Sequence, residues 1–63
     1  MELSDEKFQS LIRAAYDAIG LTDLADWLGV SKPTILRWVE GLNLPHMALR
    51  DPIRAAIAEY LTR

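Results

Sequence analysis

The chain has 63 residues, of which 51% are hydrophobic, and its seven basic and nine acidic side chains give a net charge of −2. With no cysteine and one histidine, His46, it can form no disulfide and has no residue cluster suited to a metal or cofactor. No segment reaches the roughly 18 apolar residues of a membrane span, and the acidic MELSDEK differs from a signal peptide. We therefore expect one soluble cytoplasmic domain, residues 1–63, with no membrane association and no evident small-molecule ligand.

Apolar residues recur at helical spacing throughout, and no stretch alternates with a period of two, so the sequence predicts an all-α fold. The first predicted helix spans residues 5–19. Ser4 suits its N-cap, and Asp5 and Glu6 place negative charge at the positive end of the helix dipole. The predicted buried stripe of this helix consists of Phe8, Leu11, Ile12, Ala15 and Ile19.

Two short helices are predicted next, over residues 23–28 and 32–40. Thr22 is the expected N-cap of the first, and Pro33 lies in the first turn of the second, where its missing N–H costs little. A glycine follows each of the first three apolar runs, and glycine readily adopts the left-handed conformation that ends a helix. These glycines are Gly20, Gly29 and Gly41, and each is followed by an apolar residue.

The fourth predicted helix spans residues 52–62, because Asp51 is a good N-cap and proline is favoured at the first helical position. Its predicted buried residues are Ile53, Ala56, Ile57, Tyr60 and Leu61, of which the last two fit a core or a dimer contact equally well. The result is a compact bundle of four, or five, short helices.

The segment between residues 21 and 40 is typical of a helix-turn-helix, because about three residues including a glycine join two short helices. The small side chain of Ala25 allows the second of these helices to cross closely. A helical wheel places Ile35, Trp38, Val39 and Leu42 on the inner side of the third helix. It places Pro33, Leu36, Arg37 and Glu40 on the outer side.

Residues 21–45, LTDLADWLGVSKPTILRWVEGLNLP, resemble the helix-turn-helix of Cro and phage-repressor type regulators, the xenobiotic-response-element family. The resemblance rests on Ala25, the Gly-Val-Ser turn, the Thr-Ile pair, the tryptophan and the segment from Gly41 to Pro45. The chain departs from the family pattern at two positions. Leu21 replaces a polar residue that often binds a phosphate, and Val39 replaces a residue that is often acidic.

The resemblance implies a sequence-specific regulator of transcription that binds double-stranded DNA, a repressor of phage or bacterial type. It would place its third helix in the major groove and bind a palindromic operator as a homodimer. By position, the residues expected to face bases are Ser31, Lys32, Pro33 and Arg37, and the helical wheel adds Leu36. The residues expected at phosphates are Thr22, Asn43 and His46, to which we add Thr34 and Arg50.

The charges are distributed unevenly, which allows an acidic molecule to bind DNA. Most basic residues, among them Lys32, Arg37, Arg50 and Arg54, lie in the second half, and most acidic ones lie in the first. About two or three phosphates per monomer predict a slope of roughly −4 to −5 in log K against log salt for a dimer. No nucleophile and base can be paired, and no glycine-rich phosphate loop exists, so we do not expect an enzyme. Because the resemblance implies binding to DNA, the expected location is the nucleoid.

Two alternatives remain. The first is a protein-interaction module such as an antitoxin or adaptor, which the acidic net charge and Trp27 favour. Trp27 fits either a position over the first helix or an exposed partner surface. An excisionase-like DNA-binding protein shares the valine-serine turn, the tryptophan and the following Leu-Pro. Such a protein would continue into a β-wing, where HMALRDPIRAAIAEYL predicts a helix.

Overall fold

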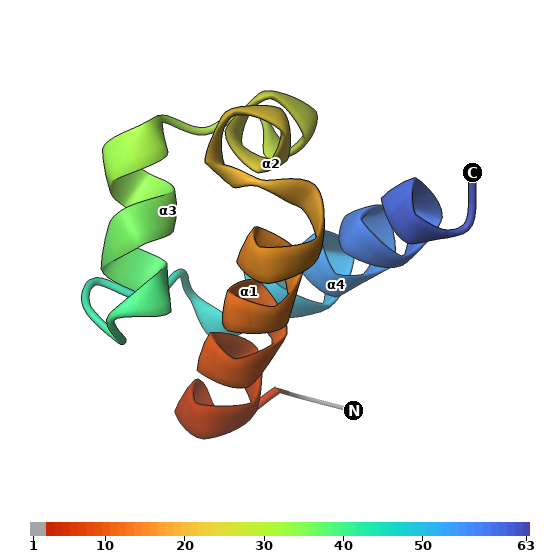
Figure 1. Cartoon of the computed structure of the whole chain (residues 1–63). Helices are drawn as coiled ribbons and strands as arrows, with labels where there is room; N and C mark the ends of the chain where they lie inside the picture. The colour runs from red at the N-terminus through yellow and green to blue at the C-terminus, as the bar shows by residue number, and fades with distance from the viewer. Residues whose placement is uncertain (1–2) are drawn as a thin grey trace.

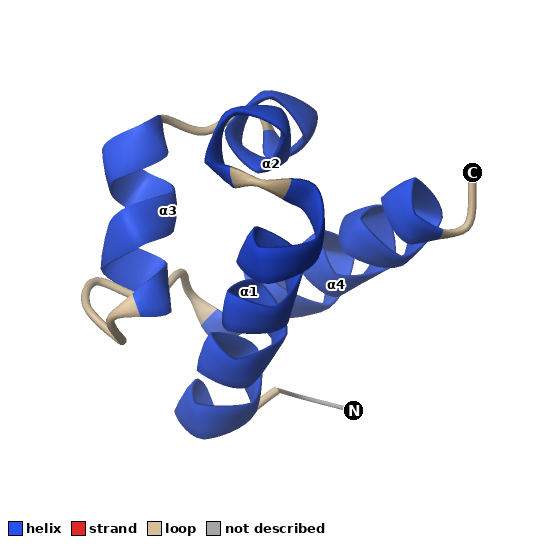
Figure 2. Ribbon diagram, in the orientation of Figure 1, coloured by secondary structure: helices blue, strands red, loops and turns tan. Residues whose placement is uncertain are grey.

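The computed structural model describes residues 3–63, which form four helices and no strand (Figures 1 and 2). The helices are α1 (Asp5–Ile19), α2 (Leu21–Leu28), α3 (Lys32–Val39) and α4 (Met47–Leu61). The radius of gyration is 10.4 Å, and a compact chain of this length is expected at about 10.6 Å. The predicted all-α bundle is therefore confirmed.

Each helix contributes at least one fully buried side chain to a single core. These residues are Phe8 and Ile12 from α1, Leu24 from α2, Ile35 from α3 and Ile57 from α4. α1 and α2 pack against one another and against both other helices, whereas α3 and α4 make no packing contact. As Figure 1 shows, α3 lies at one side of the bundle and the end of α4 at the other. One face of α3 therefore packs against α1 and α2, and the opposite face is exposed to solvent.

α1 has the predicted bounds, because its N-cap signal is local. The Ser4 hydroxyl accepts a hydrogen bond from the Lys7 N–H at 3.3 Å. At the other end, the Gly20 N–H donates to the Tyr16 carbonyl at 3.0 Å. Of the predicted stripe, Phe8, Ile12 and Ala15 are buried, and the remaining members are half-buried.

α2 begins at Leu21, so the prediction of Thr22 as its N-cap was wrong. Gly20, with φ 95° and ψ 157°, ends α1 and is also the N-cap of α2. Its carbonyl accepts from the Leu24 N–H at 3.0 Å. This backbone conformation is nearly exclusive to glycine, and it lets the next helix begin without a linker. Thr22 therefore lies inside the first turn, with its side chain exposed.

α4 begins at Met47, and the predicted start at Asp51 and Pro52 was wrong. His46 is the N-cap: its Nδ1 accepts from the Ala48 N–H at 3.0 Å, and its carbonyl accepts from the Leu49 N–H at 2.8 Å. Helix-forming residues follow directly, and Pro52 is contained inside the helix. An interior proline removes the helical donor for the carbonyl four residues earlier and crowds that carbonyl with its ring. Here this residue is Ala48, which is exposed to solvent.

Two leucines predicted to be buried are exposed because they lie at helix ends. Leu42 is 54% exposed, since α3 ends at Val39 and Gly41, with φ 79°, turns the chain before it. Leu61 is 55% exposed in the last residue of α4. Tyr60, the other residue that fitted core or dimer contact, is half-buried beside Trp27.

Candidate nucleic-acid interface

The rotation of α3 is set by its inner face. Ile35 is fully buried and Trp38 is 6% exposed. The Trp38 ring packs edge-on against Phe8 with 5.6 Å between centroids, and its indole N–H donates to the Asn43 carbonyl at 3.1 Å. The Gln9 side-chain amide of α1 donates to the Val39 carbonyl at 2.9 Å. These contacts fix which side chains of α3 face outward.

The turn between α2 and α3 closes with the hydrogen bonds of a left-handed helix end. Gly29 has φ 71° and ψ 31°, and its N–H donates to the Asp26 carbonyl at 3.3 Å. The Val30 N–H donates to the Ala25 carbonyl at 3.0 Å. Ala25 is only 3% exposed, as expected for the small residue at a close helix crossing. The two helices are therefore joined through a short turn that is fixed by backbone hydrogen bonds of Gly29 and Val30.

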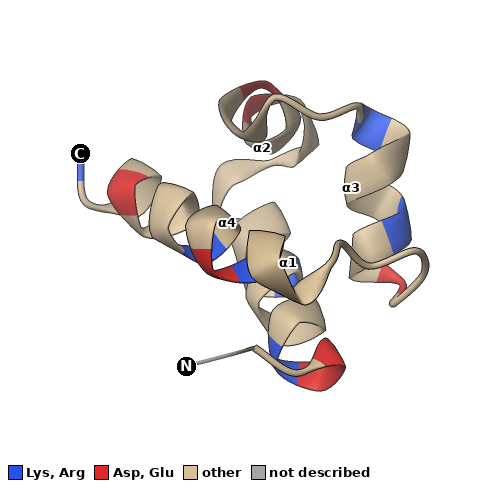
Figure 3. Cartoon of the chain, turned by 180° about the vertical axis from the view of Figure 1, so that it is seen from behind, with Lys and Arg blue, Asp and Glu red and all other residues tan. Residues whose placement is uncertain are grey.

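The predicted base-facing residues lie together at the start and along the outer side of α3. All five, Ser31, Lys32, Pro33, Leu36 and Arg37, are exposed, Leu36 at 41%. Figure 3 shows basic residues at two places along α3, with an acidic residue just beyond its end. The structure thus presents a contiguous helix face with two cations and one exposed apolar side chain.

Ser31 caps the start of α3 and is also exposed on this face. As N-cap of α3, its Oγ accepts from the Thr34 N–H at 3.3 Å, and the two hydroxyls share a hydrogen bond of 2.7 Å. Thr34 is half-buried by comparison with its neighbours. One of the two hydroxyl protons makes this shared bond, so one hydroxyl of the pair at a time can donate to a phosphate oxygen.

Three other residues predicted at phosphates are exposed and lie outside α3. Thr22 lies in the first turn of α2, and Asn43 lies in the loop after α3 with φ 49°. His46 caps α4 through Nδ1, which accepts from the Ala48 N–H. Because Nδ1 accepts, the ring proton lies on Nε2, the nitrogen available as a donor. The role of His46 as a cap was missed because histidine is not a preferred N-cap residue.

Arg50 differs from its predicted role as a phosphate ligand, because it is 6% exposed and directed into the molecule. Its Nε donates to the Pro45 carbonyl at 3.0 Å, and its Nη1 donates to the Leu3 carbonyl at 3.0 Å. Nη1 also lies 2.8 Å from the Asp5 carboxylate. The early start of α4 turns this residue toward α1. Its guanidinium therefore ties the first turn of α4 to the start of α1 and is not part of the interface.

Trp27, whose position the sequence does not settle, lies against α4 and not over α1. Its indole N–H donates to the Ala56 carbonyl at 2.6 Å, and its ring packs edge-on against Tyr60. Arg63 lies over both rings. Spacing within one helix relates Trp27 only to Asp23 on α2, and the cluster itself depends on the packing of α2 against α4, which the sequence does not reveal.

Within the described part of the chain, no group of three or more potential ligands could hold a metal ion. No helix formed by residues 3–63 is long and apolar enough to cross a membrane. Comparisons of the chain with models of protein families, with curated proteins and with solved structures give no match.

Proposed function

We propose that this chain is a sequence-specific protein that binds double-stranded DNA by placing the outer face of α3 in the major groove. The observation that carries the proposal is the division of α3 into two faces. Ile35 and Trp38 are buried, while Lys32, Leu36 and Arg37 are exposed on a helix that does not pack against α4. The major groove, about 12 Å wide, admits a helix whose diameter with side chains is about 10–12 Å.

Each exposed side chain has a contact suited to its chemistry. Arg37 can donate two parallel hydrogen bonds to O6 and N7 of a guanine. Leu36 offers an apolar contact to a thymine methyl group, and Lys32, at the start of the helix, reaches a phosphate or a base edge. Thr22, Thr34, Asn43 and His46 supply donors to phosphates beside the groove, and Ser31 and Pro33 face the bases at the helix start.

We further propose that two copies bind a palindromic operator and regulate transcription, as a repressor. One copy offers few cations to phosphates, so a monomer binds weakly and with little selectivity. The molecule measures 25 × 23 × 18 Å. Two copies can therefore touch while their α3 helices lie about 34 Å apart, one turn of DNA.

Selection from random double-stranded DNA at low salt tests the proposal. The wild-type chain should enrich a palindrome, and Arg37→Ala should remove selectivity at the contacted position, at about 1 to 3 kcal/mol per lost base contact. Arg13→Ala is the matched control, since Arg13 is an exposed arginine on α1. Failure of folded wild-type protein to enrich any palindrome would contradict the proposal.

A protein-interaction module remains a second candidate. The observations that favour it are the net charge of −2 and three leucines outside the α3 face that are more than half exposed, Leu42, Leu49 and Leu61. Under this alternative, Arg37→Ala leaves the function unchanged. The excisionase-like alternative has less support, because residues 47–61 form α4 where a wing would lie.

A further inference from the structure

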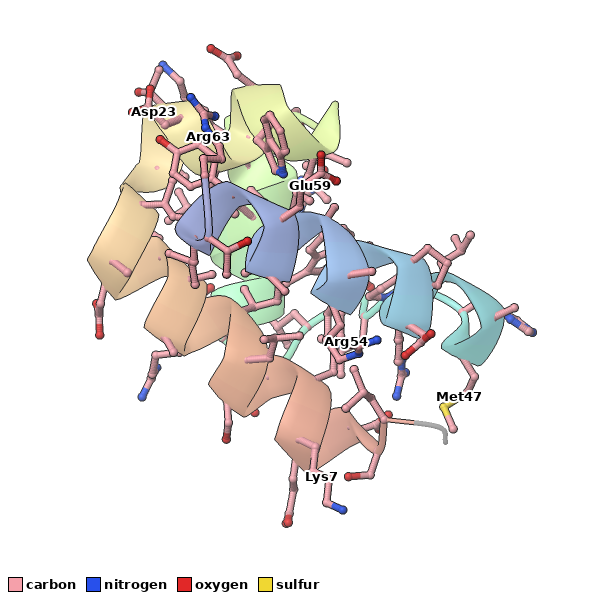
Figure 4. The ribbon with its side chains drawn as sticks, turned by 90° about the vertical axis from the view of Figure 1, so that its right-hand side faces the viewer. Lys7, Asp23, Met47, Arg54, Glu59 and Arg63 are labelled. Carbon is pink, nitrogen blue, oxygen red and sulfur yellow. The ribbon has the colours of Figure 1, made fainter. Side chains whose placement is uncertain are left out.

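An open cavity of about 330 Å³ lies between α2 and the end of α4. Its lining consists of Asp23, Asp26, Trp27, Tyr60 and Arg63. In Figure 4, the labelled side chains of Asp23 and Arg63 meet at this edge of the molecule. Figure 1 shows that the end of α4 is on the side opposite α3, so this cavity is separate from the proposed DNA-binding face.

Two aromatic rings form the apolar part of the cavity, and their arrangement is fixed. The Trp27 and Tyr60 ring centroids are 5.4 Å apart with an interplanar angle of 76°. The indole N–H of Trp27 donates to the Ala56 carbonyl at 2.6 Å, which holds the ring against α4. The rings therefore present their faces to the cavity as parts of two packed helices.

This aromatic pair already holds a guanidinium group. The Arg63 Cζ is 4.6 Å from the Tyr60 centroid and 5.2 Å from the Trp27 centroid, both within the range of cation–π attraction. Arg63 follows the end of α4, and its residue is exposed. The two rings therefore accommodate a planar cation. Arg63, which now occupies this position, is connected to the end of α4 by a short stretch of chain.

The carboxylates at the cavity add charge of the sign that attracts a cation. Asp23 and Asp26 are exposed residues on one face of α2. The ion pairs among residues 3–63 are Arg50 with Asp5 and Arg54 with Asp51, so neither cavity carboxylate lies within 4.0 Å of a nitrogen of Arg63. A cation that entered the cavity would gain both the ring faces and two nearby negative charges.

We propose that the Trp27–Tyr60 cavity binds the guanidinium group of an arginine from a polypeptide partner, and that this arginine replaces Arg63. Arg63 competes from within the same chain, and tethered groups reach effective concentrations in the millimolar range. The unaltered chain therefore binds an isolated arginine more weakly than Arg63→Ala. The site acts independently of DNA binding, since none of its residues belongs to α3.

The indole N–H signals in ¹⁵N–¹H spectra test this proposal directly, because the chain has two tryptophans. Trp27 reports on the cavity, and Trp38, buried against Phe8, is the internal control. The probes are N-acetyl-L-arginine N-methylamide, free L-arginine, and N-acetyl-L-citrulline N-methylamide, a neutral molecule of similar shape. The proteins are wild type, Arg63→Ala and Arg63→Ala with Asp23→Asn and Asp26→Asn.

The blocked arginine should shift the Trp27 signal saturably and leave the Trp38 signal in place, with at least about three-fold tighter binding to Arg63→Ala than to wild type. Loss of the two carboxylates should weaken binding about two- to five-fold. Stronger binding of free arginine than of the blocked probe would retain the guanidinium site but overturn the polypeptide source. A Trp27 signal in folded Arg63→Ala that does not respond, or responds equally to citrulline, would overturn the site itself.

Discussion

At the scale of single residues, Arg50 is the clearest case of a charge used inside the fold. Its carboxylate partner Asp5 has a side chain that is 77% exposed, so solvent weakens the ion pair. The hydrogen bonds to the carbonyls of Pro45 and Leu3 are made by a buried guanidinium, so water competes little for them. The two carbonyl hydrogen bonds should therefore contribute more to stability than the salt bridge does.

We predict that substituting Asp5 and substituting Arg50 lower the free energy of unfolding by different amounts. Asp5→Asn should lower the free energy of unfolding by about 1 kcal/mol or less, including its effect on the helix dipole. Arg50→Lys should lower it by about 2 kcal/mol or more, because an ammonium group cannot reproduce the geometry of the guanidinium bonds. Urea denaturation measures both values. Arg54→Lys, in the exposed pair with Asp51, is the control and should be nearly neutral; equal costs for Asp5→Asn and Arg50→Lys would disprove the ranking.

The position of Arg50 could not be predicted from the sequence, whereas that of Trp38 could. Trp38 lies at helical spacing from Ile35, and a large apolar residue on such a face is normally buried. Arginine is normally exposed, and nothing local marks this one as different. Its burial depends on the carbonyl acceptors of Leu3 and Pro45, and Leu3 is 47 residues away from Arg50 in the sequence.

At the scale of helices, the predictions were accurate where a preferred residue occupies a cap. Ser4 caps α1 as expected, and Ser31 caps α3 in the same way, each accepting from the backbone N–H three residues later. The predictions were wrong where a less preferred residue does the same task. His46 begins α4 ahead of the stronger Asp51-Pro52 signal, and Gly20 joins two helices without a linker. Cap preferences are modest in energy, so the packing of α4 against α1 and α2 decides its start.

The two helix junctions give a prediction about backbone strain. A Cβ added at Gly20 or Gly29 would meet no atom within 4 Å, so only the backbone conformation distinguishes them. Gly29 is in the left-handed region, and Gly29→Ala should cost about 1 to 2 kcal/mol. Gly20→Ala should cost about 2 to 3 kcal/mol, since its φ and ψ are nearly restricted to glycine.

Asparagine variants provide the matched test of this explanation, measured by thermal or urea denaturation. Gly29→Asn should recover part of the stability lost in Gly29→Ala, because asparagine tolerates the left-handed conformation. Gly20→Asn should recover none relative to Gly20→Ala. Equal recovery at both glycines would show that the cost does not arise from the backbone angles.

At the scale of the molecule, the packing leaves two separate surfaces. α3 packs only against α1 and α2, which leaves its outer face free, and the end of α4 forms the aromatic cavity with α2 on the other side. The first surface could be anticipated, because a helical wheel separates the faces of α3. The second could not, because it requires the relative position of α2 and α4, which are far apart in the chain.

The burial of Arg50 also changes the expected salt dependence of DNA binding. On the proposed DNA-binding face, Lys32 and Arg37 are the exposed basic residues. Two cations per copy at the DNA give a dimer a slope of roughly −3 to −4 in log K against log salt, shallower than the −4 to −5 expected from two or three phosphates per monomer. Fluorescence anisotropy with the selected palindrome across a salt series measures this slope.

Two variants on α3 separate the electrostatic contribution from base recognition in the same assay. If Lys32 contacts a phosphate, Lys32→Ala should reduce the magnitude of the dimer's slope by about 2, one unit for each copy, and weaken binding to all sequences alike. Leu36→Ala should leave the slope unchanged and weaken binding only where a thymine methyl is contacted. A wild-type slope steeper than about −6 would require cations outside α3 at the DNA. That result would contradict a mode of binding in which this single helix supplies the positive surface.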